Sequence, residues 1–146
     1  MAARRRRMIY VDTTALIALA NRNDRNHDEA RIFLEDMLRG GVILVIGRPV
    51  LAEFLNGVSK RVGKRRAIEL YKAYSKSKFI VIERETEGDW GKAWDAFLKY
   101  EDQDGMDLVD CLSFAIMERL NIKEAFTFDR DYETYGFTIK PGTRRV

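Results

Sequence analysis

The chain has 146 residues, of which 46% are hydrophobic and 34% charged, a size and composition that predict one globular domain. No apolar run approaches the roughly 20 residues of a membrane-spanning helix, and only four apolar residues follow the N-terminal arginines, too few for a signal peptide. Without the arginines at positions 4–7, the net charge of +3 becomes −1. These features exclude a membrane protein and a general nucleic-acid coat, and they favour a cytoplasmic location.

Residues 1–7 are predicted to be a disordered basic leader, and residues 8–146 a single domain, because no internal repeat or low-complexity linker divides them. The one cysteine, Cys111, cannot form an internal disulfide. A nucleophilic role would need a nearby base, and the one histidine, His27, is distant in sequence. Cys111 therefore fits a buried helix position, where cysteine behaves as a small hydrophobe.

The first half of the domain alternates predicted strands and helices. Residues 8–11 form a short β-favouring run that ends at Asp12, and Thr13 or Thr14 can cap the helix that follows. Residues 42–46 are apolar without alternation, which is typical of a strand covered on both faces. The other elements predicted here are helices over 15–21, 27–39, 48–62 and 64–77 and a strand over 79–82.

The second half continues the alternation. The helix predicted over 86–100 carries Trp90, Trp94 and Phe97 as an apolar stripe, which is interpreted as core rather than as a base-stacking platform. A helix predicted over 105–118 has Asp107 and Asp110 on one face at its first turn. A strand over 124–128 and a short edge strand over 136–139 follow.

Strands that alternate with helices predict an α/β fold with a mostly parallel sheet of four to five strands and helices on both faces. Ligands of such sheets bind beyond the carboxyl ends of the strands. Asp12 and Asp129 follow strands, Asp110 starts a helix, and Glu53 lies in the second turn of the helix after the second strand. An acidic set without Cys or His clusters favours Mg²⁺ or Mn²⁺, which can activate water and stabilise a phosphodiester displacement.

Four segments, over residues 8–15, 49–53, 108–114 and 125–132, resemble in order the motifs of PIN-domain ribonucleases, and in particular the VapC-type toxins of type II toxin–antitoxin pairs. The resemblance implies a single PIN-like domain in which Asp12 and Asp110 are the principal metal ligands. It also implies that Glu53 and Asp129 complete the catalytic, metal-holding pocket. The polar neighbours that it implies, which would orient ligands or water, are Thr13, Ser113 and Thr127.

Two positions depart from the family pattern. Asp107 stands where many relatives have Ser or Thr, and it is interpreted as a helix cap. Asp131 stands where relatives often have His, and no role is assigned to it. Simpler interpretations stay open for the acids themselves, because Asp110 can be a cap, Glu53 an exposed helix residue and Asp129 a turn residue.

A basic cluster provides candidate RNA contacts, and its alternative interpretation is a solvated helix face. Its members are Lys60, Arg61, Lys64, Arg65 and Arg66. By resemblance we expect a Mg²⁺-dependent endoribonuclease toxin that is neutralised by a small antitoxin and forms a homodimer through apolar residues of 31–39 and 64–77. The alternatives are an RNA-processing or quality-control nuclease without an antitoxin and a non-catalytic binding module. A phosphatase with Asp12 as nucleophile is disfavoured, because Thr14 stands where a second acid is needed.

Overall fold

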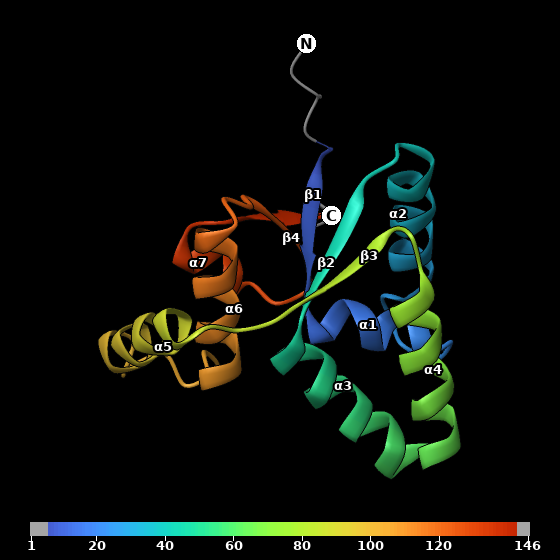
Figure 1. Cartoon of the computed structure of the whole chain (residues 1–146), viewed down its shortest axis with the longest axis horizontal. Helices are drawn as coiled ribbons and strands as arrows, with labels where there is room; N and C mark the ends of the chain where they lie inside the picture. The colour runs from blue at the N-terminus through green and yellow to red at the C-terminus, as the bar shows by residue number, and fades with distance from the viewer. Residues whose placement is uncertain (1–5, 143–146) are drawn as a thin grey trace.

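The computed structural model describes residues 6–142, and it contains one sheet of five strands in the order β3-β2-β1-β4-β5 (Figure 1). Every neighbouring pair is parallel, which confirms the predicted α/β class, and the last strand lies at an edge as expected. Of the predicted leader, residues 1–5 lie outside the described range. The strands are β1 (Met8–Val11), β2 (Ile43–Gly47), β3 (Ile80–Glu83), β4 (Glu124–Phe126) and β5 (Thr138–Lys140).

Helices lie on both sides of the sheet (Figure 1). On one side the Tyr10 hydroxyl of β1 reaches Ser113 of α6 over 2.8 Å. On the other, the Phe126 ring of β4 meets Phe33 of α2 with the ring centroids 4.8 Å apart. The helices are α1 (Thr13–Ala20), α2 (His27–Arg39), α3 (Arg48–Arg61), α4 (Lys64–Lys76), α5 (Glu87–Lys99), α6 (Leu108–Arg119) and α7 (Asp131–Tyr135). None of the helices within residues 6–142 is long and apolar enough to cross a membrane.

The strand order reverses at β1, which pairs with β2 on one side and with β4 on the other. Ligand sites of open parallel sheets lie at such reversals, beyond the carboxyl ends of the strands. The chain leaves β1 at Asp12, whose backbone N–H still donates to the Phe126 carbonyl over 3.0 Å. Asp12 is therefore held at the reversal by the backbone of two neighbouring strands.

Several element ends differ from the prediction, and each difference has a local cause. Asp12, rather than Thr13 or Thr14, caps α1, since its side chain accepts from the Thr14 N–H. Helix α6 begins at Leu108 rather than at residue 105, because Asp107 is its N-cap. Strand β4 stops at Phe126, and α7, which the sequence did not predict, follows a turn after it.

The interpretation of the α5 stripe as core is wrong. Trp90, Trp94 and Phe97 are 39%, 48% and 39% exposed, and the buried face of α5 consists of smaller residues, Ala93 and Ala96 among them. Helix α5 lies outside α6, at the left of Figure 1, and no other described element covers its outer face. Helical periodicity identified an apolar stripe, but it could not tell which side of the helix has a neighbour.

A buried ion pair fastens α5 to α6. Asp89 is 2% exposed and forms a capping box with Thr86 at the start of α5. Arg119, at the end of α6, donates from Nε and Nη2 to the Asp89 carboxylate over 3.0–3.1 Å and from Nη1 to Glu83 over 3.1 Å. The turn between β3 and α5 is thereby tied to the helix that carries Asp110.

Candidate active site

Asp12 is buried and surrounded by hydroxyl groups. Its Oδ2 accepts from the hydroxyls of Thr14 and Thr127, each over 2.8 Å, and its Oδ1 accepts from the Tyr132 hydroxyl over 3.0 Å. The Thr127 hydroxyl also accepts from the Asp129 N–H over 2.9 Å. These bonds fix the orientation of the Asp12 carboxylate and link it to the segment that carries Asp129.

Asp110 lies at the third position of α6 and serves in a capping box. The Asp107 side chain accepts from the Asp110 N–H over 2.9 Å, and Asp110 Oδ2 accepts from the Asp107 N–H over 3.2 Å. The interpretation of Asp107 as the cap is confirmed. Only one oxygen of Asp110 is used by the box, so the carboxylate can also face a ligand.

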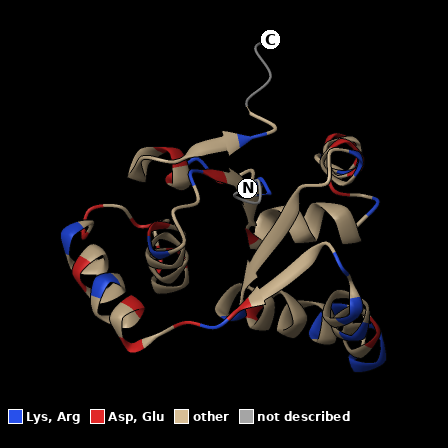
Figure 2. Cartoon of the chain, turned by 45° about the horizontal axis from the view of Figure 1, so that its top comes forward, with Lys and Arg blue, Asp and Glu red and all other residues tan. Residues whose placement is uncertain are grey.

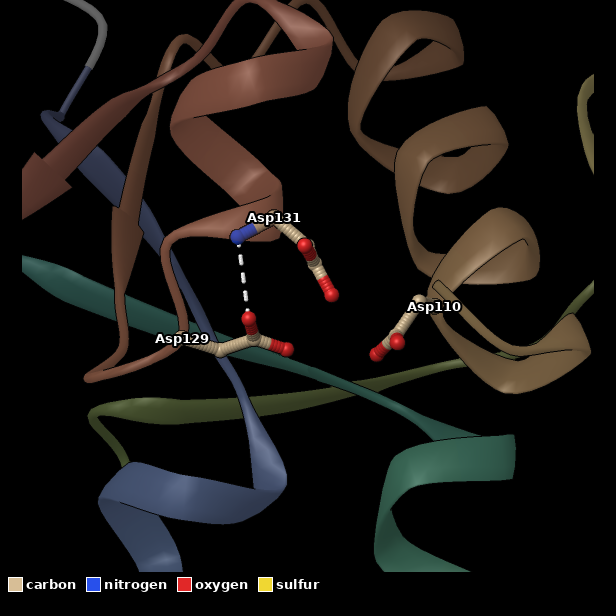
Figure 3. A group of neighbouring side chains, drawn as sticks. All are labelled: Asp110, Asp129 and Asp131. Carbon is tan, nitrogen blue, oxygen red and sulfur yellow. Dashed lines mark hydrogen bonds between the residues drawn. The ribbon is translucent and has the colours of Figure 1, made fainter. Parts of the chain in front are cut away.

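Asp129 and Asp131 lie at the turn into α7. The Asp131 N–H donates to Asp129 Oδ1 over 2.9 Å, and this bond brings both carboxylates to one side (Figure 3). Oxygens of Asp110, Asp129 and Asp131 all lie within 4.8 Å of one another. The structure therefore brings together two acids of the predicted site and one, Asp131, to which no role was assigned.

Glu53 lies on α3. Its side chain is exposed, and two hollows of about 940 and 420 Å³ both include it in their lining. Thr13 also lines the smaller hollow, and its Oγ1 is the one buried side-chain oxygen or nitrogen in residues 6–142 that has no hydrogen-bond partner. Of the predicted polar neighbours, Thr127 contacts Asp12 and Ser113 contacts Tyr10. The Thr13 hydroxyl lies close enough to Glu53 to act on its pKa but has no partner within hydrogen-bond distance among the described residues.

The acids act on one another electrostatically. Burial, followed by the charges of Asp107, Asp12 and Asp129, raises the pKa of Asp110 to about 9. Burial is also the main cause that raises the pKa of Asp129 to about 6, with Asp131 and Asp12 adding to it. Glu53 is exposed as a residue, but partial burial of its carboxyl and the charges of Asp107 and Asp12 raise its pKa, while the nearby Thr13 hydroxyl lowers it. Buried carboxylates that also repel one another form a site that a cation would stabilise.

Three supporting residues were missed by the sequence analysis. Thr14 and Tyr132 donate to Asp12, and Tyr10 binds Ser113 beneath the site. Burial raises the pKa of the Tyr132 phenol well above its usual value, so the phenol stays a hydrogen-bond donor. The sequence contained one weak indication that Thr14 contacts Asp12, because a hydroxyl residue two positions after an acid can bond to it in a turn. It held none for the tyrosines, which are indistinguishable from core aromatics.

The basic cluster lies where α3 meets α4, at the lower right of Figure 2. Its five members are exposed, and Arg61 and Arg66 line the same hollow as Thr13 and Glu53. Positive charge is therefore available in the hollow that Glu53 also lines.

The donor set suits a divalent cation that prefers oxygen. Asp110, Asp129 and Asp131 offer only carboxylate oxygens, and in the part of the chain that the structure describes neither cysteine nor histidine belongs to the cluster. The thiol of Cys111 is buried, and burial together with the nearby Asp110 and Asp107 raises its pKa to about 11, so it stays protonated at neutral pH. An acidic site for a divalent cation is thus present, and a thiolate nucleophile is not.

A parallel α/β sheet with an acidic site at its carboxyl edge is the architecture expected of PIN domains, and the chain matches the PIN domain family over residues 9–138. It therefore belongs to this family, which confirms the resemblance seen in the sequence. The 23S rRNA-specific endonuclease VapC20 of Mycobacterium tuberculosis is 28% identical over 135 residues, 92% of this chain and 99% of that protein.

Solved structures agree with this assignment. The crystal structure of VapC20 of Mycobacterium tuberculosis, described as a sarcin–ricin loop cleaving toxin, superposes with a TM-score of 0.79 at 26% identity and covers 89% of this chain and 96% of that one. VapBC2 of Rickettsia felis, bound to a DNA fragment from its promoter, has a TM-score of 0.68 at 16% identity over 91% and 97% of the two chains. FitAcB of Neisseria gonorrhoeae superposes with a TM-score of 0.66 at 14% identity and covers 90% of this chain and 96% of that one. The last two show the shared fold alone.

Proposed function

We propose that the chain is an endoribonuclease that requires Mg²⁺ or Mn²⁺ and acts as the toxin of a toxin–antitoxin pair. The observation that carries the proposal is the convergence of Asp12, Asp110 and Asp129 at the strand-order reversal of a PIN domain. The relative VapC20 is an endonuclease specific for 23S rRNA, and this supports RNA as the substrate class.

In this proposal, the acids bind the cation and the hydroxyl groups orient Asp12. Asp12 and Asp110 would be the principal cation ligands, with Glu53 and Asp129 completing the set. A divalent cation, when bound, lowers the pKa of a coordinated water molecule and stabilises the charge that develops on the phosphate. The hydroxyls of Thr14, Thr127 and Tyr132 hold Asp12 in one orientation, so the ligand geometry is fixed before RNA arrives.

The basic cluster would bind the RNA backbone, which the acids alone would repel. Replacing Lys64 and Arg65 by Gln should weaken RNA binding and reduce the slope of log K against log salt by about 1.4, because each lost phosphate contact in single-stranded RNA contributes about 0.7. The matched control replaces Lys92 and Lys99 of α5 by Gln, which removes the same charge outside the basic cluster. An unchanged salt slope in the Lys64/Arg65 variant contradicts this part of the proposal.

A small antitoxin that covers the acidic edge would be the partner, as expected of the toxin class to which the relative VapC20 belongs. A cytoplasmic location follows from the proposed RNA substrate. The homodimer stays a prediction: Ile32 on α2 and Ile68 and Tyr71 on α4 are exposed, but α5 exposes a larger apolar face. Sedimentation of the purified chain tests it.

The direct test is cleavage of a synthetic sarcin–ricin loop hairpin and of total RNA in Mg²⁺ or Mn²⁺. Asp12→Asn and Asp110→Asn should each abolish cleavage, while Asp28→Asn, which changes the same charge on exposed α2, should not. Saturable Mn²⁺ binding without cleavage of any RNA would favour a non-catalytic binding module. Full cleavage by either site variant would refute the assignment.

A further inference from the structure

Asp131 is the one carboxylate beside the site that neither the sequence nor the family pattern assigns. We propose that Asp131 is an additional ligand of the divalent cation, and that it shares one cation position with Asp129 and Asp110. The inference rests on the proposed metal-dependent function, and it extends the ligand set beyond the four acids implied by the family motifs.

The geometry that supports the proposal is the turn into α7. The bond from the Asp131 N–H to Asp129 Oδ1 fixes the two residues relative to each other, and the three side chains point toward one another in Figure 3. Their oxygens, all within 4.8 Å of one another, come from two separate elements. One cation can therefore contact all three.

The charges of this trio are not balanced within the described structure. None of the ion pairs found among residues 6–142 involves Asp110, Asp129 or Asp131. A capping role explains Asp131 poorly, because α7 has only five residues and a helix of that length has a weak dipole. Asp12, by contrast, already accepts three hydroxyl hydrogen bonds. Asp131 thus adds a negative charge beside two carboxylates, Asp110 and Asp129, that have no cationic partner in the described residues.

The loop before α6 leaves space for this carboxylate. A Cβ added at Gly105 would lie 2.9 Å from Asp131 Oδ2, and no other neighbour outside Asp131 lies within 4 Å. Gly105 does not have a positive φ, so its backbone conformation suits alanine as well. A Gly105→Ala variant therefore moves the Asp131 carboxylate while it keeps its charge.

The experiment titrates Mn²⁺ into the full chain without RNA and follows free Mn²⁺ by electron paramagnetic resonance. Asp131→Asn should raise the Kd for Mn²⁺ about tenfold or more, a loss that even a supporting group of a metal site can cause. Gly105→Ala should raise it in the same direction. The matched controls are Glu133→Gln, an exposed acid on the same helix, and Gly91→Ala on α5, and both should stay within about twofold of the wild type.

Thermal unfolding separates a ligand from a structural residue. In EDTA, Asp131→Asn should unfold at the wild-type temperature or above it, since one repelling charge is gone, and Mn²⁺ should raise its Tm less than that of the wild type. A lower Tm in EDTA with an unchanged Mn²⁺ shift would assign Asp131 a structural role and overturn the proposal.

The remaining outcomes are also decisive. An unchanged Kd in Asp131→Asn contradicts the inference even if the chain cleaves RNA, and so does a wild type without saturable Mn²⁺ binding. A wild type that binds Mn²⁺ in a manner dependent on Asp131 but leaves RNA intact supports the inference and refutes the proposed function.

Discussion

The Tyr132 hydroxyl donates to Asp12 Oδ1 over 3.0 Å, so a tyrosine of α7 fixes a carboxylate that is 120 residues away in the chain. Tyr132 is fully buried, and its ring packs edge-on against Phe114 with the centroids 4.9 Å apart. The orientation of Asp12 therefore depends on how α7 packs against α6.

Tyr132→Phe tests this dependence, because it removes the hydroxyl and keeps the ring. We expect a loss of about 1–3 kcal/mol of unfolding free energy, since the buried Asp12 oxygen loses a donor. We also expect Mn²⁺ affinity to fall about 10-fold or more, as for other residues that orient a metal ligand. Urea unfolding and Mn²⁺ titration measure the two effects. Tyr71→Phe, at an exposed position on α4, is the control and should change neither. Unaltered Mn²⁺ affinity in Tyr132→Phe would show that the hydroxyl does not orient Asp12.

The acidic cluster predicts an unusual pH dependence of stability in the metal-free protein. Between pH 6 and 9 the folded state keeps a proton on Asp110, whose pKa is about 9, whereas the unfolded state has lost it. The folded state binds more protons, so its stability falls as pH rises, by at most about 1.4 kcal/mol per pH unit for one proton. Urea midpoints in EDTA at pH 6, 7, 8 and 9 measure the slope. Asp110→Asn should remove most of it, and stability that rises over this range would contradict the argument.

Arg119 should contribute to stability through its contact with buried Asp89. Arg119→Ala leaves that carboxylate without its partner and should cost about 2 kcal/mol, less than the roughly 3–5 kcal/mol of a fully buried pair, because the Arg119 side chain is 32% exposed. Arg39→Ala breaks only exposed pairs and should cost less than about 0.5 kcal/mol. Equal urea midpoints for the two variants would refute this account of the α5–α6 junction.

Gly47 allows the Tyr10 hydroxyl to reach Ser113. A Cβ at residue 47 would overlap the Tyr10 hydroxyl oxygen and lie 3.2 Å from Ile116 Cδ1, so Gly47→Ala should destabilise the fold by about 1–3 kcal/mol. Gly91→Ala, in a helix with nothing within 4 Å of the added carbon, should stabilise it by about 0.5–1 kcal/mol. Calorimetric Tm values of the two variants and the wild type measure these changes. A Gly47→Ala protein with the wild-type Tm would show that Tyr10 can move without a loss of stability.

The sequence was sufficient to predict the parallel sheet and the positions of its acids. Uninterrupted apolar runs such as 43–46 identify buried strands, and a residue that directly follows a parallel strand must lie at the carboxyl edge. Asp12 could be placed on that basis. Asp129 could be placed at the same edge from a predicted strand over 124–128, although β4 ends at Phe126. Asp107 could be recognised as a cap because its side chain precedes an apolar helix.

The remaining features depend on tertiary contacts that local patterns do not contain. The exposed face of α5 follows from the absence of a covering element in the described chain, which periodicity cannot detect. The role of Tyr132 depends on a hydrogen bond to a residue at the other end of the domain. The turn after β4 depends on the Thr127 hydroxyl, which binds Asp12 and the Asp129 backbone.

One measurement tests the central claim, that the converging acids hold the divalent cation on which RNA cleavage depends. The initial rate of RNA cleavage is recorded against Mn²⁺ concentration, and the Kd for Mn²⁺ is determined on the same protein without RNA. The account predicts that the concentration for half-maximal rate tracks the Kd, that Asp110→Asn loses both saturable binding and cleavage, and that EDTA abolishes cleavage. Cleavage at the full rate in EDTA, or by Asp110→Asn without bound Mn²⁺, would contradict it.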